Sequence, residues 1–170
     1  MGSLVHCNEV LGTKKLQCHN NINRGEISEQ IFSTKCFTEY GYMVSMPIGT
    51  ADYDLVVDVD GRLLRVQVKS SIYKSHNSDT IRFTITKGTN GQKNGRGKYP
   101  YPEDSIDFFA LHFDNKEWYI IPRHATASTQ TLCIQEHCKY QQYKDNWEFL
   151  DDPTVNISNP LTEMMSNDTV

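Results

Sequence analysis

Cysteines, apolar runs and basic residues are each in short supply in this 170-residue chain, and each shortage excludes a class of protein. The five cysteines are odd in number and form no Cys-x-x-Cys pair, which argues against a disulfide framework and favours a reducing compartment. No stretch approaches the roughly 20 apolar residues of a membrane span, and the first residues lack the apolar core of a secretion signal. We therefore expect a soluble, cytoplasmic protein with no membrane partner.

The shortage of basic residues holds for the whole chain but not for its middle third. The formal net charge is −4, which taken alone argues against a nucleic-acid partner. Residues 61–98 nevertheless contain nine Lys or Arg against a single acid, whereas the rest of the chain contains eight against twenty. One third of the sequence is therefore strongly basic, and the average hides it.

The length and the local patterns favour one domain. Residues 1–23 show no clean hydrophobic period and are expected to form an N-terminal arm, and 151–170 an irregular C-terminal tail. The folded unit is placed at 24–150. Its predicted order of a helix, a strand, a hairpin and further strands indicates a mixed α/β fold, in which a mixed β-sheet is flanked by helices.

The predicted helix covers 25–40, "GEISEQIFSTKCFTEY", and Gly41 is a natural left-handed stop after it. On a 3.6-residue period Glu29, Phe32, Cys36 and Tyr40 share one stripe, so Glu29 lies at the end of the inward-looking face. A short strand is expected within 42–49. The segment 137–149 is ambiguous between helix and loop.

The segment 54–69 predicts a hairpin, because "DLVVDV" and "LLRVQVK" flank the tight-turn dipeptide Asp60-Gly61. Strand alternation puts Leu64, Val66 and Val68 on one face, and it puts Arg65, Gln67 and Lys69 on the other. Another alternating run at 80–87 should bury Ile81, Phe83 and Ile85. Two more strands are predicted in "SIDFFALHF" and "EWYIIP", joined at Asp114-Asn115.

Glu29, Asp54, Gln67 and Lys69 suit phosphodiester hydrolysis if the fold brings them together. A hard cation such as Mg²⁺ takes oxygen ligands, which Asp54, the amide of Gln67 and the main-chain carbonyl of Val68 would supply. Glu29 would reach the ion from the helix, directly or through a water molecule. The Lys69 amine would orient the attacking water or, with a lowered pKa, help to take its proton.

These residues also carry a resemblance to a known family. "GEISE", "YDLVVDV" and "RVQVKS" are similar to the core signature of the PD-(D/E)XK nuclease superfamily, and the wording from "GYMVSMPIG" to "EWYIIP" resembles the group I intron homing endonucleases of that type. Glu29 matches the helix glutamate of the signature, Asp54 its aspartate and Lys69 its lysine. Gln67 stands where Asp or Glu is usual, so the expected site has one negative charge fewer.

The resemblance implies a restriction-endonuclease-like core, a Mg²⁺ cofactor, cleavage of double-stranded DNA and assembly into a homodimer or homotetramer. The basic segment would then contact phosphates, with Lys93, Arg96 and Lys98 in a glycine-rich loop. Ser70 and Ser71 would touch the scissile phosphate, and Arg82 would join the DNA-contacting residues. Two alternatives stay open: a junction-resolving or repair nuclease of the same fold, or a DNA-binding module with weakened catalysis, of which Gln67 would be the sign.

A structural zinc site is a further alternative. Cys133, His137 and Cys138 lie close together in the sequence, and Cys7, Cys18 and His19 lie upstream. Their spacings match no standard zinc finger, so incidental thiols are the preferred interpretation.

Overall fold

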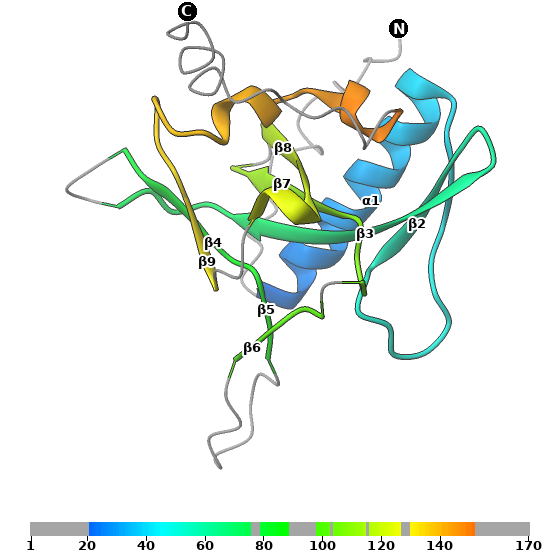
Figure 1. Cartoon of the computed structure of the whole chain (residues 1–170), viewed down its shortest axis with the longest axis horizontal. Coiled ribbons are helices and arrows are strands. Elements are labelled where there is room, and N and C mark those ends of the chain that lie inside the picture. The colour runs from blue at the N-terminus through cyan, green and yellow to red at the C-terminus, as the bar shows by residue number, and fades with distance from the viewer. Residues whose placement is uncertain are drawn as a thin grey trace, which may run out of the picture.

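A computed structural model describes residues 21–75, 79–88, 98–102, 104–114, 116–126 and 130–151. Its centre is a five-stranded mixed sheet in the order β1-β2-β3-β7-β8, with helix α1 packed across one face (Figure 1). These elements are α1 (Asn21–Tyr40), β1 (Met43–Ser45), β2 (Leu55–Val59), β3 (Arg62–Ser71), β7 (Phe108–Phe113) and β8 (Glu117–Pro122). The predicted mixed α/β class, with a mixed β-sheet and a helix against it, is confirmed.

Helix α1 begins at Asn21, four residues before the predicted start. Gly25 costs about 1 kcal/mol relative to Ala inside a helix, which is too little to stop a helix whose apolar side is buried farther along. The end is as predicted: Gly41 has a φ of 73°, and its N–H donates to the carbonyl of Phe37. Phe32 and Cys36 are fully buried, and the partly exposed Tyr40 stacks on Trp147.

The predicted hairpin is confirmed in strands β2 and β3. Asp60 and Gly61 both have a positive φ, as a tight two-residue reversal requires. The strands pair antiparallel with Leu55 opposite Val66, and the buried residues alternate as expected, with Leu55, Val57 and Val59 inward.

Strand β3 also pairs in parallel with β7, and this pairing makes the sheet mixed. Val66 lies opposite Phe108 and Ser71 opposite Phe113. β7 turns back into β8 through Asp114, which has a φ of 48°, so the second predicted hairpin is present. Every residue of β7 is buried because both faces of the sheet are covered at this point.

The face opposite α1 packs against a small sheet in which β4 (Ile81–Thr84) pairs with β9 (Thr131–Ile134). A second small sheet pairs β5 (Thr86–Lys87) with β6 (Tyr99–Pro100). Ile81, Phe83 and Ile85 are buried as predicted. Together with Phe109 and Leu111 they belong to a core on this side, while Phe32, Val66 and Ala110 belong to the core under α1.

The remaining described elements are short 3-10 helices, η1 (Arg123–Thr126), η2 (Gln141–Tyr143) and η3 (Trp147–Leu150). The last two resolve the ambiguous segment 137–149 as turns of 3-10 helix. In the part of the chain that the structure describes, no helix combines the length and the apolar character that a bilayer crossing requires.

One buried polar pair ties α1 to the sheet. His112 of β7 and Ser28 of α1 are both essentially inaccessible, and the imidazole Nδ1 lies 2.9 Å from the Ser28 hydroxyl. The imidazole stacks on Trp118 with ring centroids 4.0 Å apart. Burial lowers the pKa of His112 to about 4, so the ring is neutral in the folded protein at pH 7.

We expect His112 to make the protein less stable in mild acid. Between pH 6.5 and 4 the unfolded chain binds a proton at this imidazole and the folded chain does not, so the free energy of unfolding falls as the pH falls. The loss from pH 7 to pH 5 is about 2 kcal/mol. Urea unfolding at both pH values measures it, and His112→Gln should remove this part of the pH dependence.

The matched control is the exposed His137, whose change to Asn should leave the pH dependence as it is in the wild type. NMR titration of the His112 ring covers the case in which the Gln variant does not fold. A ring that takes up its proton near pH 6.5 in the folded protein would contradict the expectation.

Candidate active site

The candidate site forms where strand β3 extends beyond the end of its neighbour β2. β2 begins at Leu55, opposite Val66, whereas β3 continues to Ser71. Beyond Val66, among the described residues, β3 is paired with β7 on one side and has no strand on the other. Main-chain groups on this open edge need other partners, because an unpaired buried N–H or carbonyl is costly.

Asp54 supplies the partner for the open edge. Its main-chain N–H donates to the carbonyl of Val66 at 3.0 Å, and its carboxylate Oδ2 accepts the N–H of Val68 at 2.8 Å. The same oxygen accepts a hydrogen bond from the amide of Gln67. Gln67 also donates to the carbonyl of Val68 at 3.3 Å, so the amide nitrogen sits between two oxygens.

The carboxyl of Asp54 is withdrawn from water. Burial raises its pKa, while the hydrogen bond from Val68, the charge of Lys69 and the hydrogen bond from Gln67 act in the opposite direction. The net direction is upward, so the effect of burial outweighs these hydrogen bonds and the charge of Lys69.

Glu29 approaches the same point from α1. Gln67 and Lys69 project from the face of β3 opposite to the helix. Because β2 does not extend past Val66, the edge of β3 is open there, and side chains from both faces can reach it. Burial raises the pKa of Glu29, and the negative charges of Asp54 and Glu26 raise it further, against the effect of Lys69. Conversely, burial lowers the pKa of the Lys69 amine, and the two carboxylates Asp54 and Glu29 oppose this.

A cavity of about 1490 Å³ opens at this edge. The structure brings five predicted residues together along its wall: Glu29, Asp54, Gln67, Val68 and Lys69. Four of the predicted DNA-contacting residues line it as well, namely Ser70, Ser71, Arg82 and Lys98. Lys93 and Arg96 lie outside the described residues.

The cavity wall also contains residues that the sequence patterns did not single out. Several of them are cationic or aromatic, among them Arg24, Tyr73, Tyr99 and Tyr101. The alternation of Tyr and Pro at 99–102 directly after Lys98 was the available signal, because aromatic side chains among basic ones are typical of nucleic-acid surfaces. Tyr101 is 6% exposed, and its ring centroid lies 5.4 Å from the Lys69 amine.

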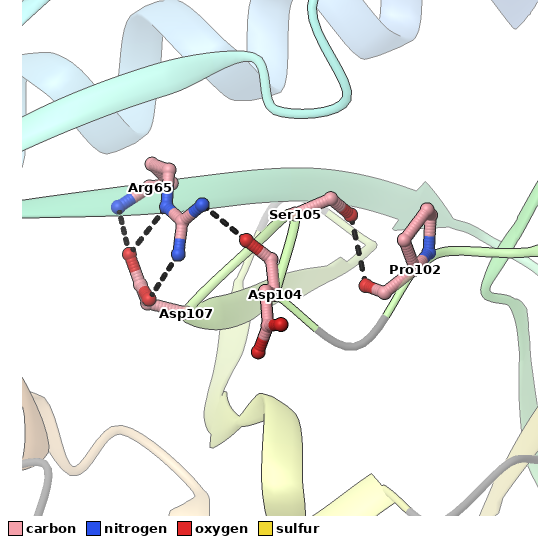
Figure 2. A network of polar contacts seen from close by, with 5 residues as sticks. All are labelled: Arg65, Pro102, Asp104, Ser105 and Asp107. Atoms are coloured by element: carbon pink, nitrogen blue, oxygen red, sulfur yellow. Dashed lines mark hydrogen bonds and ion pairs between the residues drawn. The ribbon is translucent and has the colours of Figure 1, made fainter.

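An ion pair on β3 fixes the segment that follows Tyr101 (Figure 2). The guanidinium of Arg65 donates from Nε and Nη2 to the two oxygens of Asp107 at 3.0 and 2.9 Å, and the main-chain N–H of Arg65 adds a third bond at 2.7 Å. Burial alone would raise the pKa of Asp107, but the hydrogen bonds from Arg65 outweigh it and lower the pKa. Arg65 also donates to the carbonyl of Asp104, and the hydroxyl of Ser105 closes the turn onto the carbonyl of Pro102.

The oxygen atoms at the open edge fit a hard divalent cation. Glu29 and Asp54 offer carboxylates, and Val68 and Gln67 carry neutral carbonyl oxygens; in this structure the Gln67 amide nitrogen is the atom that contacts Asp54 and the Val68 carbonyl. The described residues contain no cluster of three or more His, Cys, Asp or Glu side chains, so the candidate site has two carboxylates rather than three.

The alternative zinc site finds no such support. Cys133 and His137 are exposed and Cys138 is half-buried, and no metal-binding cluster forms around them among the described residues. Cys7, Cys18 and His19 lie outside those residues.

Comparison with known proteins agrees with this geometry. No curated protein matches the chain in sequence. The structure is similar to that of a bacterial homing endonuclease, I-Ssp6803I, with a TM-score of 0.67 and 22% sequence identity, over 88% of this chain and 98% of that one. The family model of the PD-(D/E)XK endonucleases matches residues 19–150, which contain the open edge, its two carboxylates and Lys69. The chain belongs to the PD-(D/E)XK endonuclease family.

Proposed function

We propose that this chain is a Mg²⁺-dependent, site-specific endonuclease that hydrolyses phosphodiester bonds of double-stranded DNA, of the intron-homing type. The observation that carries the proposal is the meeting of Asp54, Glu29 and Lys69 at the open edge of β3, inside a cavity lined by further cations. Membership of an endonuclease family and the similarity in fold to a bacterial homing endonuclease support it.

In this proposal Asp54, the carbonyl of Val68, the amide oxygen of Gln67 and Glu29 hold the Mg²⁺ ion. When bound, the ion supplies Lewis-acid stabilisation of the negative charge on the phosphoryl oxygens. The pKa values of Asp54 and Glu29 are raised chiefly by burial, so holding these two carboxylates in their charged form without a cation costs stability. Gln67 completes the donor set without adding a third negative charge.

Lys69 acts on the attacking water in this proposal. Its amine projects into the same cavity as the carboxylates and has a lowered pKa because it is buried. An ammonium in this place donates hydrogen bonds to the water or to the phosphate, and a neutral amine takes a proton from the water as it attacks. Both roles need the nitrogen atom close to the scissile bond.

The cations around the cavity supply the contacts to the DNA backbone. Arg82 and Lys98 are exposed on strand β4 and before strand β6, respectively, and both line the cavity together with Ser70 and Ser71. Lys93 and Arg96 belong to the same basic segment in sequence, and we keep them in the proposed DNA-binding set. Phosphate contacts of this kind position a duplex without reading its bases.

Nicking of supercoiled plasmid DNA in the presence of Mg²⁺ tests the catalytic proposal. We expect Asp54→Ala and Lys69→Ala each to lower the rate by at least about a hundredfold, since each removes a charge that acts in the transition state. Mg²⁺ should also raise the melting temperature of the wild type, and it should not raise that of Asp54→Ala, because ligand binding to the folded state stabilises it.

Lys116→Ala is the matched control, because Lys116 is an exposed lysine on the turn between β7 and β8. Undiminished nicking in both site variants would contradict the proposal. Binding of duplex DNA without cleavage in any divalent ion would favour a DNA-binding module with weakened catalysis. Faster cleavage of branched than of linear DNA would favour a junction-resolving or repair nuclease.

The DNA-contacting residues are tested through the salt dependence of binding. Arg82→Ala and Lys98→Ala should each weaken the binding of a labelled linear duplex. Each should also reduce the slope of log K against log salt concentration by about 1, because each removes one phosphate contact. Fluorescence anisotropy at several salt concentrations measures both effects. An unchanged slope in both variants would exclude them from the interface, and Lys116→Ala again serves as the control.

The described residues of each chain form one candidate site, and cutting both strands in a single binding event calls for two, so we propose a homodimer or homotetramer. Large apolar side chains exposed on α1, β1 and the β2–β3 hairpin are available for such contacts: Phe37, Met43 and Leu63 are each at least 60% exposed. Analytical ultracentrifugation should show a mass of two or four chains. A monomer at micromolar concentration, with and without duplex DNA, would contradict this part of the proposal.

A further inference from the structure

The Lys69 amine has unusual surroundings for a charged group that is partly buried. Among the described residues it makes no ion pair and no hydrogen bond, although Asp54 and Glu29 act on it electrostatically. The Nζ atom of Lys69 lies over the ring of Tyr101, 5.4 Å from the ring centroid. A lysine cation is attracted to the face of an aromatic ring within about 6 Å.

Tyr101 is itself held from several directions. Its ring packs edge-on against Phe109, with centroids 5.7 Å apart and an interplanar angle of 70°. Its carbonyl accepts a hydrogen bond from Arg123 at 3.0 Å. The Arg65–Asp107 ion pair secures the segment that follows it (Figure 2). By strand alternation Arg65 lies on the same face of β3 as Lys69. The position of the Tyr101 ring and the position of the Lys69 amine therefore both depend on strand β3.

We propose that Tyr101 is the positioning residue for Lys69: its ring holds the amine at the open edge of β3 without taking any of its hydrogen-bond donors. This inference rests on the proposed function, because it assigns a role within the same reaction.

An aromatic ring differs from a carboxylate in what it leaves free. A carboxylate in contact with Lys69 would accept one or two of its N–H groups and compete with the attacking water and the phosphate. A ring face attracts the positive charge through its quadrupole, and it has no oxygen lone pairs that would accept the N–H groups as a carboxylate does. The amine thus keeps its donors for the substrate while its position is restricted.

The role belongs to the ring rather than to the phenol hydroxyl. Phenylalanine offers the same face, whereas leucine keeps much of the apolar packing against Phe109 and loses the attraction for a cation. A positioning role therefore predicts that Tyr101→Phe retains function and that Tyr101→Leu loses it. A purely structural role predicts losses in both stability and DNA binding.

The experiment compares Tyr101→Leu and Tyr101→Phe with the wild type and with Lys69→Met. The rate of nicking of supercoiled plasmid DNA is measured with Mg²⁺ and saturating enzyme, and the affinity for a labelled duplex is measured separately. We expect Tyr101→Leu to lower the rate by about tenfold with affinity unchanged, and Tyr101→Phe to stay within about threefold of the wild type. Tyr40→Leu, on α1 away from the cavity, controls for the loss of a tyrosine.

NMR provides a readout that does not depend on activity. With lysine labelled at Cε, the Lys69 side chain should give a ring-current-shifted signal in the wild type and in Tyr101→Phe. The signal should return to the position of exposed lysines in Tyr101→Leu. Melting temperatures identify any variant that fails to fold.

The outcomes separate the two proposals. A wild type that does not nick DNA with any divalent ion defeats the proposed function and this inference with it. Loss of nicking in Lys69→Met together with full nicking in Tyr101→Leu overturns the inference and leaves the proposed function standing. Equal losses of rate and DNA affinity in Tyr101→Leu, or an unshifted Lys69 signal in the wild type, also overturn it.

Discussion

The hydrogen bond from the Val68 amide to the Asp54 carboxylate is the contact on which the candidate site depends. It lies where β2 has not yet begun and β3 has lost its partner on that side. A backbone N–H there must be paired, and a side-chain carboxylate takes the place of the missing strand. The same contact holds Asp54 beside Gln67 and the Val68 carbonyl. Pairing the open main chain of β3 therefore also brings together most of the oxygens of the proposed metal site.

This arrangement concentrates charge on half-buried side chains at the wall of the cavity. Burial raises the pKa values of Asp54 and Glu29 and lowers that of Lys69, so in each case it disfavours the charged form. Two carboxylates near one another add repulsion that a single buried amine does not cancel. Such a cluster costs stability in the fold alone, and proteins retain costs of this kind at functional sites. The proposed cation and a phosphodiester would each relieve part of the imbalance.

Local patterns in the sequence predict much of the fold and the composition of the candidate site. The hairpins of β2–β3 and β7–β8 follow from alternation and turn residues, and the helix stripe of Phe32 and Cys36 follows from its period. The pairing of β4 with β9 joins segments about fifty residues apart, which no local pattern reveals. The start of α1 was missed because Gly25 looked like a boundary. Tyr101 was missed because the segment around it had the composition of a basic loop, while its burial comes from Phe109 and Arg123, far along the chain or on another element.

Strand β3 explains why these separate features act together. Its odd-numbered residues Arg65, Gln67 and Lys69 share one face and respectively secure the segment after Tyr101, contact Asp54 and enter the cavity. Its even-numbered residues Val66 and Val68 belong to the core under α1, from which Glu29 reaches the edge. Because side chains alternate with a period of two, a slip of one residue in the pairing with β2 would move the valines out of the core. The same slip would turn Gln67 and Lys69 away from the cavity and Arg65 away from Asp107. The burial of two valines therefore enforces the placement of the polar groups, and the register that stabilises the sheet is the register that builds the site.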